Sequence, residues 1–262
     1  MSLPEVDIIG TGNLAFNLAP ALEQCGMVIN NVFGRSIESA KSIADNLYQA
    51  NPTTELNFSA SKSTLFILAV SDDAIEEVSQ ELILPDYAIA AHTSGSMDLS
   101  VLGYTASPNI GVLYPLQTFS KQKRVDFSDV PLLVEGDNKF TKNVLLSVAR
   151  KLTQNVLEAR SAQRRMIHLA AIFAANFTNS LLVQANELLE KADADLEILA
   201  PLLEETIRKS LTIGPKKAQT GPAARGDLEV LDQHMELLER FPEIQEVYRL
   251  INQQILDRHE RD

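Results

Sequence analysis

The stretch Val6-Asp7-Ile8-Ile9-Gly10-Thr11-Gly12-Asn13-Leu14-Ala15 decides the fold of this chain, because an apolar strand runs through Gly-x-Gly-x-x-Ala into a helix. Gly10 allows a tight turn, Gly12 leaves room for a phosphate, and Ala15 lets the helix pack closely on the strand. The helix N-terminus then offers free N–H groups to an anion. The motif predicts a pyrophosphate site; a glycine turn in another kind of α/β protein is the alternative.

The end of the second predicted strand, 27–33, indicates which dinucleotide binds. It is followed by Gly34-Arg35-Ser36, at a place where NAD sites usually carry Asp or Glu. A guanidinium can bind a 2′-phosphate in a bidentate way, and a hydroxyl can add a further hydrogen bond. We therefore expect NADP(H) to be preferred over NADH. In the alternative, Ser36 only caps a helix over 37–49 and Arg35 is a solvated charge.

Strands and helices alternate as far as residue 158. Further strands are predicted at 58–60, 65–70, 87–91, 110–119 with a break at Pro115, 130–136 and 155–157, with helices at 74–82 and 138–152. Asp72 or Asp73 is expected to cap the helix at 74–82. This alternation predicts an α/β Rossmann domain with a doubly wound, mainly parallel sheet over residues 1–158. Ligands of such sheets lie beyond the carboxyl ends of the strands, so Val70, Ser71 and Pro115 are expected near the dinucleotide.

A polar turn, His92-Thr93-Ser94-Gly95-Ser96, follows the strand at 87–91. Its hydroxyl and backbone N–H groups suit a small carboxylate or carbonyl oxygen. We expect Ser94, Gly95 and Ser96 to bind substrate, and Ser94 also to act in catalysis. An ordinary polar turn is the alternative.

Residues 159–262 contain helical patterns only, which predicts a separate all-α domain. A helix is expected over 164–191, apolar on most sides and therefore buried. At 100° per residue, His168, Asn179 and Asn186 share one face and Asn176 lies somewhat off it. We expect His168 and Asn176 to act in catalysis and Asn179 to bind substrate. Core or subunit-interface polar residues are the alternative.

A loop over 214–227 combines glycines, prolines and cations in an otherwise acidic chain, which is typical of a shaped functional loop. Arg225 is the candidate for binding a substrate carboxylate, with Thr220 beside it; a structural salt bridge is the alternative for Arg225. Helices are predicted at 195–211, at 228–240 with Asp227 as its cap, and at 243–258.

Composition narrows the function classes. The net charge is −12 without a cluster of Lys or Arg, so nucleic acid and acidic membranes are not expected as partners. A single Cys25 cannot form an internal disulfide, and four scattered histidines show no metal-ligand spacing. The first strand begins too early for a secretory signal, and no run reads as a membrane span. We expect a cytoplasmic protein without a metal.

Several motifs together resemble one family. They are the Gly10 to Ala15 motif, the His92 to Ser96 turn, Tyr114-Pro115-Leu116-Gln117-Thr118-Phe119, the segment from His168 to Asn179, and Thr220-Gly221-Pro222-Ala223-Ala224-Arg225-Gly226-Asp227 followed by His234. The family is an uncharacterised bacterial one that joins a Rossmann-like NADP-binding domain to a C-terminal helical domain of unknown function. More distantly, the layout is similar to pyrroline-5-carboxylate reductase, ketopantoate reductase and the β-hydroxyacid dehydrogenases.

The resemblance implies a 6-phosphogluconate-dehydrogenase-like arrangement and hydride transfer with a small carboxylate-bearing substrate. It also implies a homodimer formed through the C-terminal helices. One departure matters, because the β-hydroxyacid dehydrogenases carry a catalytic Lys where this chain has Ile172, four residues before Asn176. His168 is the nearest substitute, since an imidazole suits acid or base catalysis near neutral pH. Thr178 and Thr220 stay open as lesser candidates.

The sequence therefore predicts an NADP(H)-dependent oxidoreductase acting on a keto acid, imine or hydroxy acid. The predicted cofactor residues are Gly10, Thr11, Gly12, Asn13, Leu14, Ala15, Arg35, Ser36, Val70, Ser71 and Pro115. The rival hypothesis is an NADP(H)-binding sensor or regulatory protein without catalysis, because the family-type Lys is missing. A decarboxylating dehydrogenase is a third possibility.

Overall fold

The computed structural model describes residues 3–259, and contacts divide the chain into two compact units, Met1–Ala174 and Ala175–Asp262. The domain boundary predicted after residue 158 lies at the end of the last strand. The first compact unit continues beyond it, because Ser161 and Arg164 at the start of the following helix are buried against that unit.

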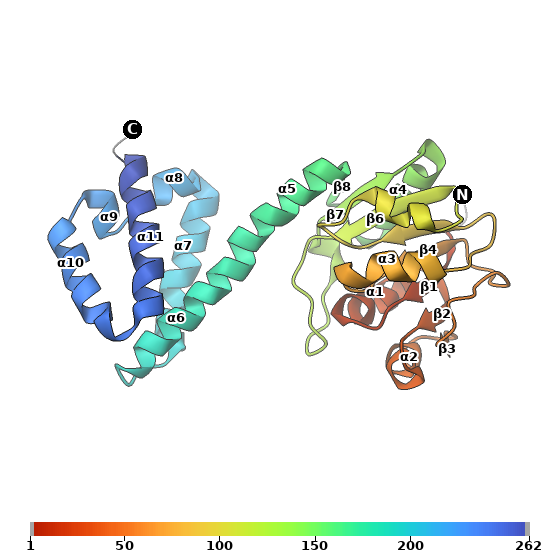
Figure 1. Ribbon diagram of the computed structural model, residues 1–262, viewed down its shortest axis with the longest axis horizontal. Coiled ribbons are helices and arrows are strands. Elements are labelled where there is room, and N and C mark those ends of the chain that lie inside the picture. Colours follow the sequence, from red (N-terminus) through yellow and green to blue (C-terminus); the bar gives the residue numbers. More distant parts are fainter. Residues whose placement is uncertain (1–2, 260–262) are drawn as a thin grey trace. The chain divides into compact units, whose positions relative to one another are not determined.

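An 8-stranded sheet forms the centre of the first unit, in the order β3-β2-β1-β4-β5-β6-β7-β8 (Figure 1). Every neighbouring pair is parallel except β6 and β7. The strands are β1 (Glu5–Ile9), β2 (Val28–Phe33), β3 (Asn51–Thr53), β4 (Leu65–Leu68), β5 (Ile89–His92), β6 (Asn109–Pro115), β7 (Leu132–Gly136) and β8 (Val156–Glu158). This order confirms the predicted Rossmann sheet, whose direction of winding reverses between β1 and β4.

The third strand is not where the sequence pattern places it. The strand predicted at 58–60 is wrong: β3 pairs with β2 instead, and Phe58 packs in a hydrophobic core cluster. Pro52 lacks an N–H group for pairing, but β3 lies at the sheet edge, where proline is tolerated.

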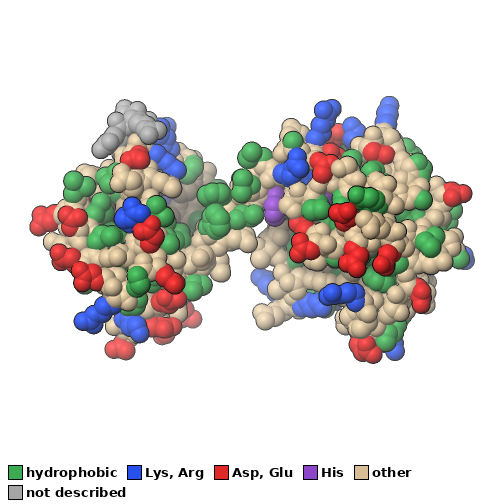
Figure 2. Space-filling model, viewed as in Figure 1, with side chains coloured by type: hydrophobic (Ala, Val, Ile, Leu, Met, Phe, Trp, Pro, Cys, Tyr) green, Lys and Arg blue, Asp and Glu red, His purple; other side chains and the backbone are tan. Residues whose placement is uncertain are grey.

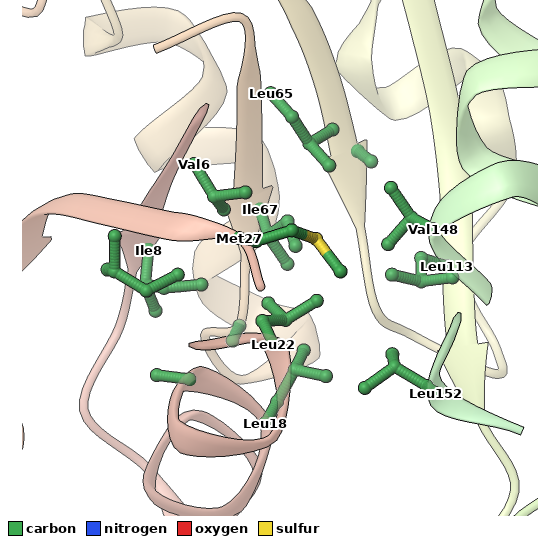
Figure 3. Close-up of a cluster of buried hydrophobic side chains, with 14 of the residues drawn as sticks. Val6, Ile8, Leu18, Leu22, Met27, Leu65, Ile67, Leu113, Val148 and Leu152 are labelled. Carbon is green, nitrogen blue, oxygen red and sulfur yellow. The ribbon is translucent and has the colours of Figure 1, made fainter. Parts of the chain in front are cut away.

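Helices cover both faces of the sheet. They are α1 (Asn13–Gln24), α2 (Ile37–Ala44), α3 (Asp72–Glu81) and α4 (Lys139–Leu152), with short 3₁₀ helices η1 (Leu99–Tyr104) and η2 (Phe127–Asp129). Side chains of α1 and α4 meet those of β1, β4 and β6 in one core cluster, where Leu22, Leu113 and Val148 point toward one another (Figure 3). A second cluster joins α3 and η1 to the opposite face. Burial on both faces explains why β4 is apolar throughout. β1 also buries Asp7, whose carboxylate accepts hydrogen bonds from Ser61, Ser63 and Asn31.

The end of α2 and the cap of α3 differ from the prediction. α2 ends at Ala44 rather than at residue 49, although Ser36 caps it as the alternative interpretation proposed. The N-cap of α3 is Ser71, whose side chain makes no capping hydrogen bond, so a cap by Asp72 or Asp73 is wrong. The Asp72 carboxylate instead accepts a hydrogen bond from Ser96 Oγ.

The long helix predicted at 164–191 is continuous from Ser161 to Glu190. It consists of α5 (Ser161–Ala171), a π-helical segment η3 (Ile172–Phe177) and α6 (Thr178–Glu190), and the boundary between the compact units falls inside η3. A π-helix has a wider turn than an α-helix. The 3.6-residue period that placed His168 and Asn179 on one face therefore does not hold across this segment.

The same helix corrects two further expectations. No residue of η3 or α6 is buried in this chain, so burial on most sides is wrong. The helix Ser161–Glu190 is long enough and apolar enough to cross a membrane, by length and composition only. The expectation that no segment meets these two criteria is therefore wrong. Those measures do not distinguish a membrane span from a helix whose apolar surface packs against protein.

The second unit continues with helices. They are η4 (Leu196–Leu199), α7 (Ala200–Ile213), α8 (Pro215–Ala218), α9 (Pro222–Arg225), α10 (Leu228–Leu237), η5 (Leu238–Arg240) and α11 (Pro242–His259). Its described residues bury only four apolar side chains, Ala223, Leu231, Leu238 and Ile244. Hydrophobic side chains are visible over the surface of this unit (Figure 2). Asp227 is the N-cap of α10, as predicted, but its side chain makes no capping hydrogen bond and its carboxylate pairs with Arg225 instead.

Candidate functional site

A cleft of about 720 Å³ lies at the carboxyl ends of β1, β2 and β4. Its volume suits a small molecule or cofactor. Of the predicted cofactor residues, all but Ala15 and Pro115 line the cleft: Gly10, Thr11, Gly12, Asn13, Leu14, Arg35, Ser36, Val70 and Ser71. Ala15 is fully buried in α1, and Pro115 is buried at the end of β6. The cleft also has walls that the prediction left out, among them Phe33, Gly34 and Ser39.

The glycine turn gives this cleft its exposed backbone. Gly10 has a φ of +125°, and a Cβ atom there would lie 2.7 Å from the carbonyl carbon of Ala69, so only glycine fits. A Cβ atom on Gly12 would meet nothing within 4 Å. Gly12 is also the N-cap of α1, where no side chain caps the helix. The first N–H groups of α1 are therefore left for an anion, as a pyrophosphate requires.

The far wall of the cleft is formed by the end of β2 and the start of α2. Gly34 allows the residue after β2 to lie close to the glycine turn, because a Cβ atom on Gly34 would lie 2.9 Å from Thr11 Cγ2. Arg35 is exposed, and within residues 3–259 no hydrogen bond or ion pair engages its guanidinium. Ser36 Oγ accepts from the Ser39 N–H at 3.2 Å, so capping occupies part of its hydrogen-bonding capacity. An available guanidinium at this position fits a 2′-phosphate.

The turn after β5 is held by its own side chains. Ser94 Oγ accepts from the N–H groups of Ser96 at 3.1 Å and Met97 at 3.0 Å. Ser96 Oγ donates to the Asp72 carboxylate. These bonds shape the turn and place a negative charge beside it. Substrate binding by Ser94, Gly95 and Ser96 stays a prediction.

His92, the first residue of the turn motif, is fully buried. Its Nδ1 accepts from the Ser94 N–H at 3.1 Å, and among the described residues its buried Nε2 has no hydrogen-bond partner. Burial, together with the nearby positive charge of Arg164, lowers the pKa of His92 to about 4. His92 is therefore a neutral structural histidine near pH 7.

His168 on α5 lies against this turn and against Tyr114 on β6. Its Nδ1 is 2.9 Å from Tyr114 Oη, and the two rings meet edge to face with centroids 5.7 Å apart. A Cβ atom on Gly95 would lie 2.6 Å from His168 Nδ1, so the turn packs directly on the pair. The structure thus brings together two predicted residues, Gly95 and His168, with one that the prediction missed, Tyr114. The sequence feature that could have pointed to Tyr114 is its position next to Pro115, at the carboxyl end of a strand.

A buried ion pair anchors α5. Arg164 is fully buried, and its guanidinium binds the Glu135 carboxylate on β7 and the Met97 carbonyl oxygen. Ser161 adds two hydrogen bonds to the same carboxylate, through its N–H at 2.9 Å and its Oγ at 2.8 Å. This network fixes the helix one turn before His168. No local sequence signal links Arg164 to Glu135.

The remaining predicted residues belong to the second unit. Asn176 in η3, Asn179 in α6 and Thr220 are exposed. Arg225 is exposed as well, and it pairs with Asp227 at 2.8 Å. That pair matches the alternative interpretation of Arg225 as a salt-bridge residue, while its role toward substrate stays a prediction. Within residues 3–259, no group of three or more His, Cys, Asp or Glu could hold a metal ion.

Comparisons with known proteins agree with this architecture. Residues 2–113 match a family model described as a Rossmann-like domain, and residues 130–255 match one described as a domain of unknown function, DUF2520. No curated protein gives a significant match.

Solved structures give similarities over nearly the whole chain. The "putative NADP oxidoreductase BF3122" from Bacteroides fragilis is 37% identical with a TM-score of 0.88, covering 97% of this chain and 98% of that one. Protein TM1727 from Thermotoga maritima is 20% identical with a TM-score of 0.72, covering 97% and 98%. A 1-pyrroline-5-carboxylate reductase from Streptococcus pyogenes is 13% identical with a TM-score of 0.64, covering 97% and 99%. At these lower identities the likeness shows the fold alone.

The predicted resemblance is confirmed by the pair of family models and by the likeness to BF3122. The chain belongs to the family in which a Rossmann-like domain is followed by a DUF2520 domain.

Proposed function

We propose that this protein is an NADP(H)-dependent oxidoreductase that transfers hydride to or from a small carboxylate-bearing keto acid, imine or hydroxy acid. The observation that carries the proposal is the cleft of about 720 Å³ with the uncapped glycine turn on one wall and Arg35 on the other. The printed name of BF3122, "putative NADP oxidoreductase", supports the same class of activity.

In this proposal each wall of the cleft recognises a different part of the dinucleotide. Gly12 and the first turn of α1 hold the pyrophosphate through backbone N–H groups, while the N–H of Gly10 donates to the Phe33 carbonyl oxygen at 2.9 Å and shapes the turn. Arg35 and Ser36 bind the 2′-phosphate, which a carboxylate at that position would repel. The bound cofactor supplies hydride chemistry, and the protein supplies position and charge.

His168 moves the proton that accompanies the hydride. An imidazole is suited to this role near neutral pH, and the contacts of His168 with Tyr114 and Gly95 place it beside the turn after β5. Ser94 and Ser96 would orient the substrate. The roles of Asn176 and Arg225, which lie in the other compact unit, stay predictions; Arg225 would have to exchange Asp227 for a ligand carboxylate, which costs little because exposed ion pairs contribute little stability.

Cofactor preference is the first test. Calorimetric titration should show NADPH binding at least about tenfold more tightly than NADH, a difference of about 1.4 kcal/mol. Arg35→Ala should abolish that difference, whereas Lys41→Ala, an exposed cation of α2 outside the cleft, should preserve it. Equal affinities in the wild-type protein would remove the NADP(H) assignment.

Catalysis is the second test. Small keto acids, imines and hydroxy acids would be screened with NADPH or NADP⁺, and His168→Ala should lower kcat roughly 10²- to 10⁴-fold. An NADP(H)-binding protein that transfers hydride with none of them, yet changes its assembly with the NADPH to NADP⁺ ratio, would be a sensor instead.

We also propose that two copies of the chain associate through the helical unit. We further propose that the protein acts in the cytoplasm and does not bind a membrane. The second unit buries too few apolar side chains to form a core of ordinary size, and Leu181, Val183 and Leu202 are 42%, 53% and 63% exposed. Light scattering should give a dimer, which Leu181→Asp combined with Leu202→Asp should dissociate. Tyr48→Asp, at an exposed position of the nucleotide unit, should not. A wild-type monomer, or partition of the protein into vesicles, would contradict the proposal.

A further inference from the structure

The hydrogen bonds of the turn after β5 run in one direction. Ser94 Oγ accepts from the N–H groups of Ser96 at 3.1 Å and Met97 at 3.0 Å, which uses both of its lone pairs. Its single hydrogen is left for Ser96 Oγ, 3.3 Å away. Ser96 cannot be the donor in that contact, because its own hydrogen goes to the Asp72 carboxylate, which only accepts. The order of donation is therefore Ser94 to Ser96 to Asp72.

The open end of this chain of hydrogen bonds presents acceptors. Ser96 Oγ keeps one lone pair, and within residues 3–259 the second carboxylate oxygen of Asp72 accepts no hydrogen bond and pairs with no cation. The N–H of Ser94 donates to His92 Nδ1 at 3.1 Å. Among the described residues nothing accepts from the N–H of Gly95, but Gly95 is buried. The exposed end of the turn thus offers lone pairs and a negative charge, whereas an anion or a carbonyl oxygen requires donors.

Asp72 lies where the cofactor cleft meets this turn. It belongs to the first turn of α3, and the preceding residue, Ser71, lines the cleft. Its partner Ser96 directly follows Gly95, which packs on His168. The carboxylate is exposed, so a ligand can reach it. A substrate held between the cofactor and His168 would therefore meet this charge.

The charge of Asp72 also acts on the surrounding side chains. Burial and then this carboxylate raise the pKa of the Tyr114 phenol, which contacts His168. Arg164 acts on Tyr114 in the opposite sense, but its guanidinium is already paired with Glu135. Hydride addition to a carbonyl places negative charge on oxygen, which a nearby carboxylate disfavours. An iminium ion instead brings a positive charge and N–H donors, which a carboxylate binds well.

We propose that Asp72, oriented by Ser96, binds the positively charged nitrogen of the substrate, so that the protein interconverts an iminium ion and an amine. The inference rests on the proposed function, because it selects one of its three substrate classes. Hydride from the cofactor adds to the iminium carbon, and the π pair of the C=N bond becomes a lone pair on nitrogen. The nitrogen needs no proton in this step. Protonated His168 then gives its proton to that lone pair and takes another from water.

The test compares a keto acid with the iminium ion formed from it. NADPH oxidation would be followed with pyruvate and with phenylpyruvate, each alone and with an excess of methylamine. The kcat/KM should be at least about tenfold higher with methylamine, as expected for a hydrogen bond between charged groups. Asp72→Asn keeps an acceptor for Ser96 but removes the charge. It should lower the kcat/KM for the iminium ion, relative to that for the keto acid, by about tenfold.

Asp73→Asn is the matched control. Asp73 is exposed in the same first turn of α3, so this variant removes an equal charge from the same helix end and leaves Ser96 and Asp72 in place. It should change the kcat/KM for the iminium ion less than about twofold. Calorimetry should give the wild-type protein and both variants the same Kd for NADPH and the same Kd for NADP⁺.

The possible results separate this inference from the proposed function. Reduction of keto acids that methylamine does not enhance, or equal effects of the two substitutions, would overturn the inference and leave the proposed function intact. A loss of NADP⁺ affinity in Asp72→Asn alone would assign the carboxylate to the charged nicotinamide ring, and would overturn it as well. A protein that transfers hydride to neither class of substrate would refute the proposed function, and this inference with it.

Discussion

Stability should fall in mildly acidic solution because of His92. An unfolded histidine has a pKa of about 6.5, whereas burial beside Arg164 lowers the pKa of His92 to about 4 in the folded protein. Between these two values the unfolded chain binds a proton that the folded chain does not bind. Stability is therefore fully present above pH 6.5 and decreases as the pH falls toward 4.

The size of this effect follows from the two pKa values. Each unit of difference is worth about 1.4 kcal/mol, so the complete loss below pH 4 is about 3 kcal/mol. Between pH 7 and pH 4.5 the loss is about 2 kcal/mol. That amount is a substantial part of the stability of an ordinary domain, for which 5–15 kcal/mol is typical.

Urea unfolding followed by circular dichroism at several pH values measures this loss. His92→Asn is the matched variant, because Oδ1 of asparagine can replace Nδ1 as the acceptor for the Ser94 N–H. The variant should lack the part of the pH dependence that lies between pH 6.5 and 4.5. A direct NMR titration of the His92 ring covers the case in which the variant fails to fold. A ring that titrates near pH 6.5, or equal pH dependences in the two proteins, would refute the reasoning.

Three other variants test the glycine turn and the anchor of α5. Gly10→Ala should destabilise the first unit and prevent dinucleotide binding, because the added Cβ would lie 2.7 Å from the Ala69 carbonyl carbon. Gly12→Ala has free space and should leave urea unfolding unchanged while weakening NADPH binding at least about tenfold in calorimetry; equal losses of stability in both would contradict this distinction. Arg164→Leu should cost about 3–5 kcal/mol in urea unfolding, since it leaves the Glu135 carboxylate without its charge partner, and added Glu135→Gln should restore part of the loss.

The parts of the fold that follow from local rules could be predicted from the sequence. The Gly10 turn is determined by a backbone conformation that only glycine adopts freely, and β1 and β4 by burial on both faces. The Asn51–Thr53 strand has no such signature. It pairs with one neighbour only, contains a proline and is three residues long, so its existence depends on the edge of β2 rather than on its own residues.

The site divides along the same line. The position of Arg35 in the cleft could be predicted, because strand ends in this kind of sheet line the ligand cleft whatever the rest of the chain does. The contact between Tyr114 and His168 joins residues 54 positions apart, and it depends on a helix whose anchor, Arg164, bonds to Glu135 29 positions away. Neither pairing leaves a periodic or spacing signal. The residues that line the cleft could therefore be found from one sequence, whereas the contacts of His168 required the tertiary structure.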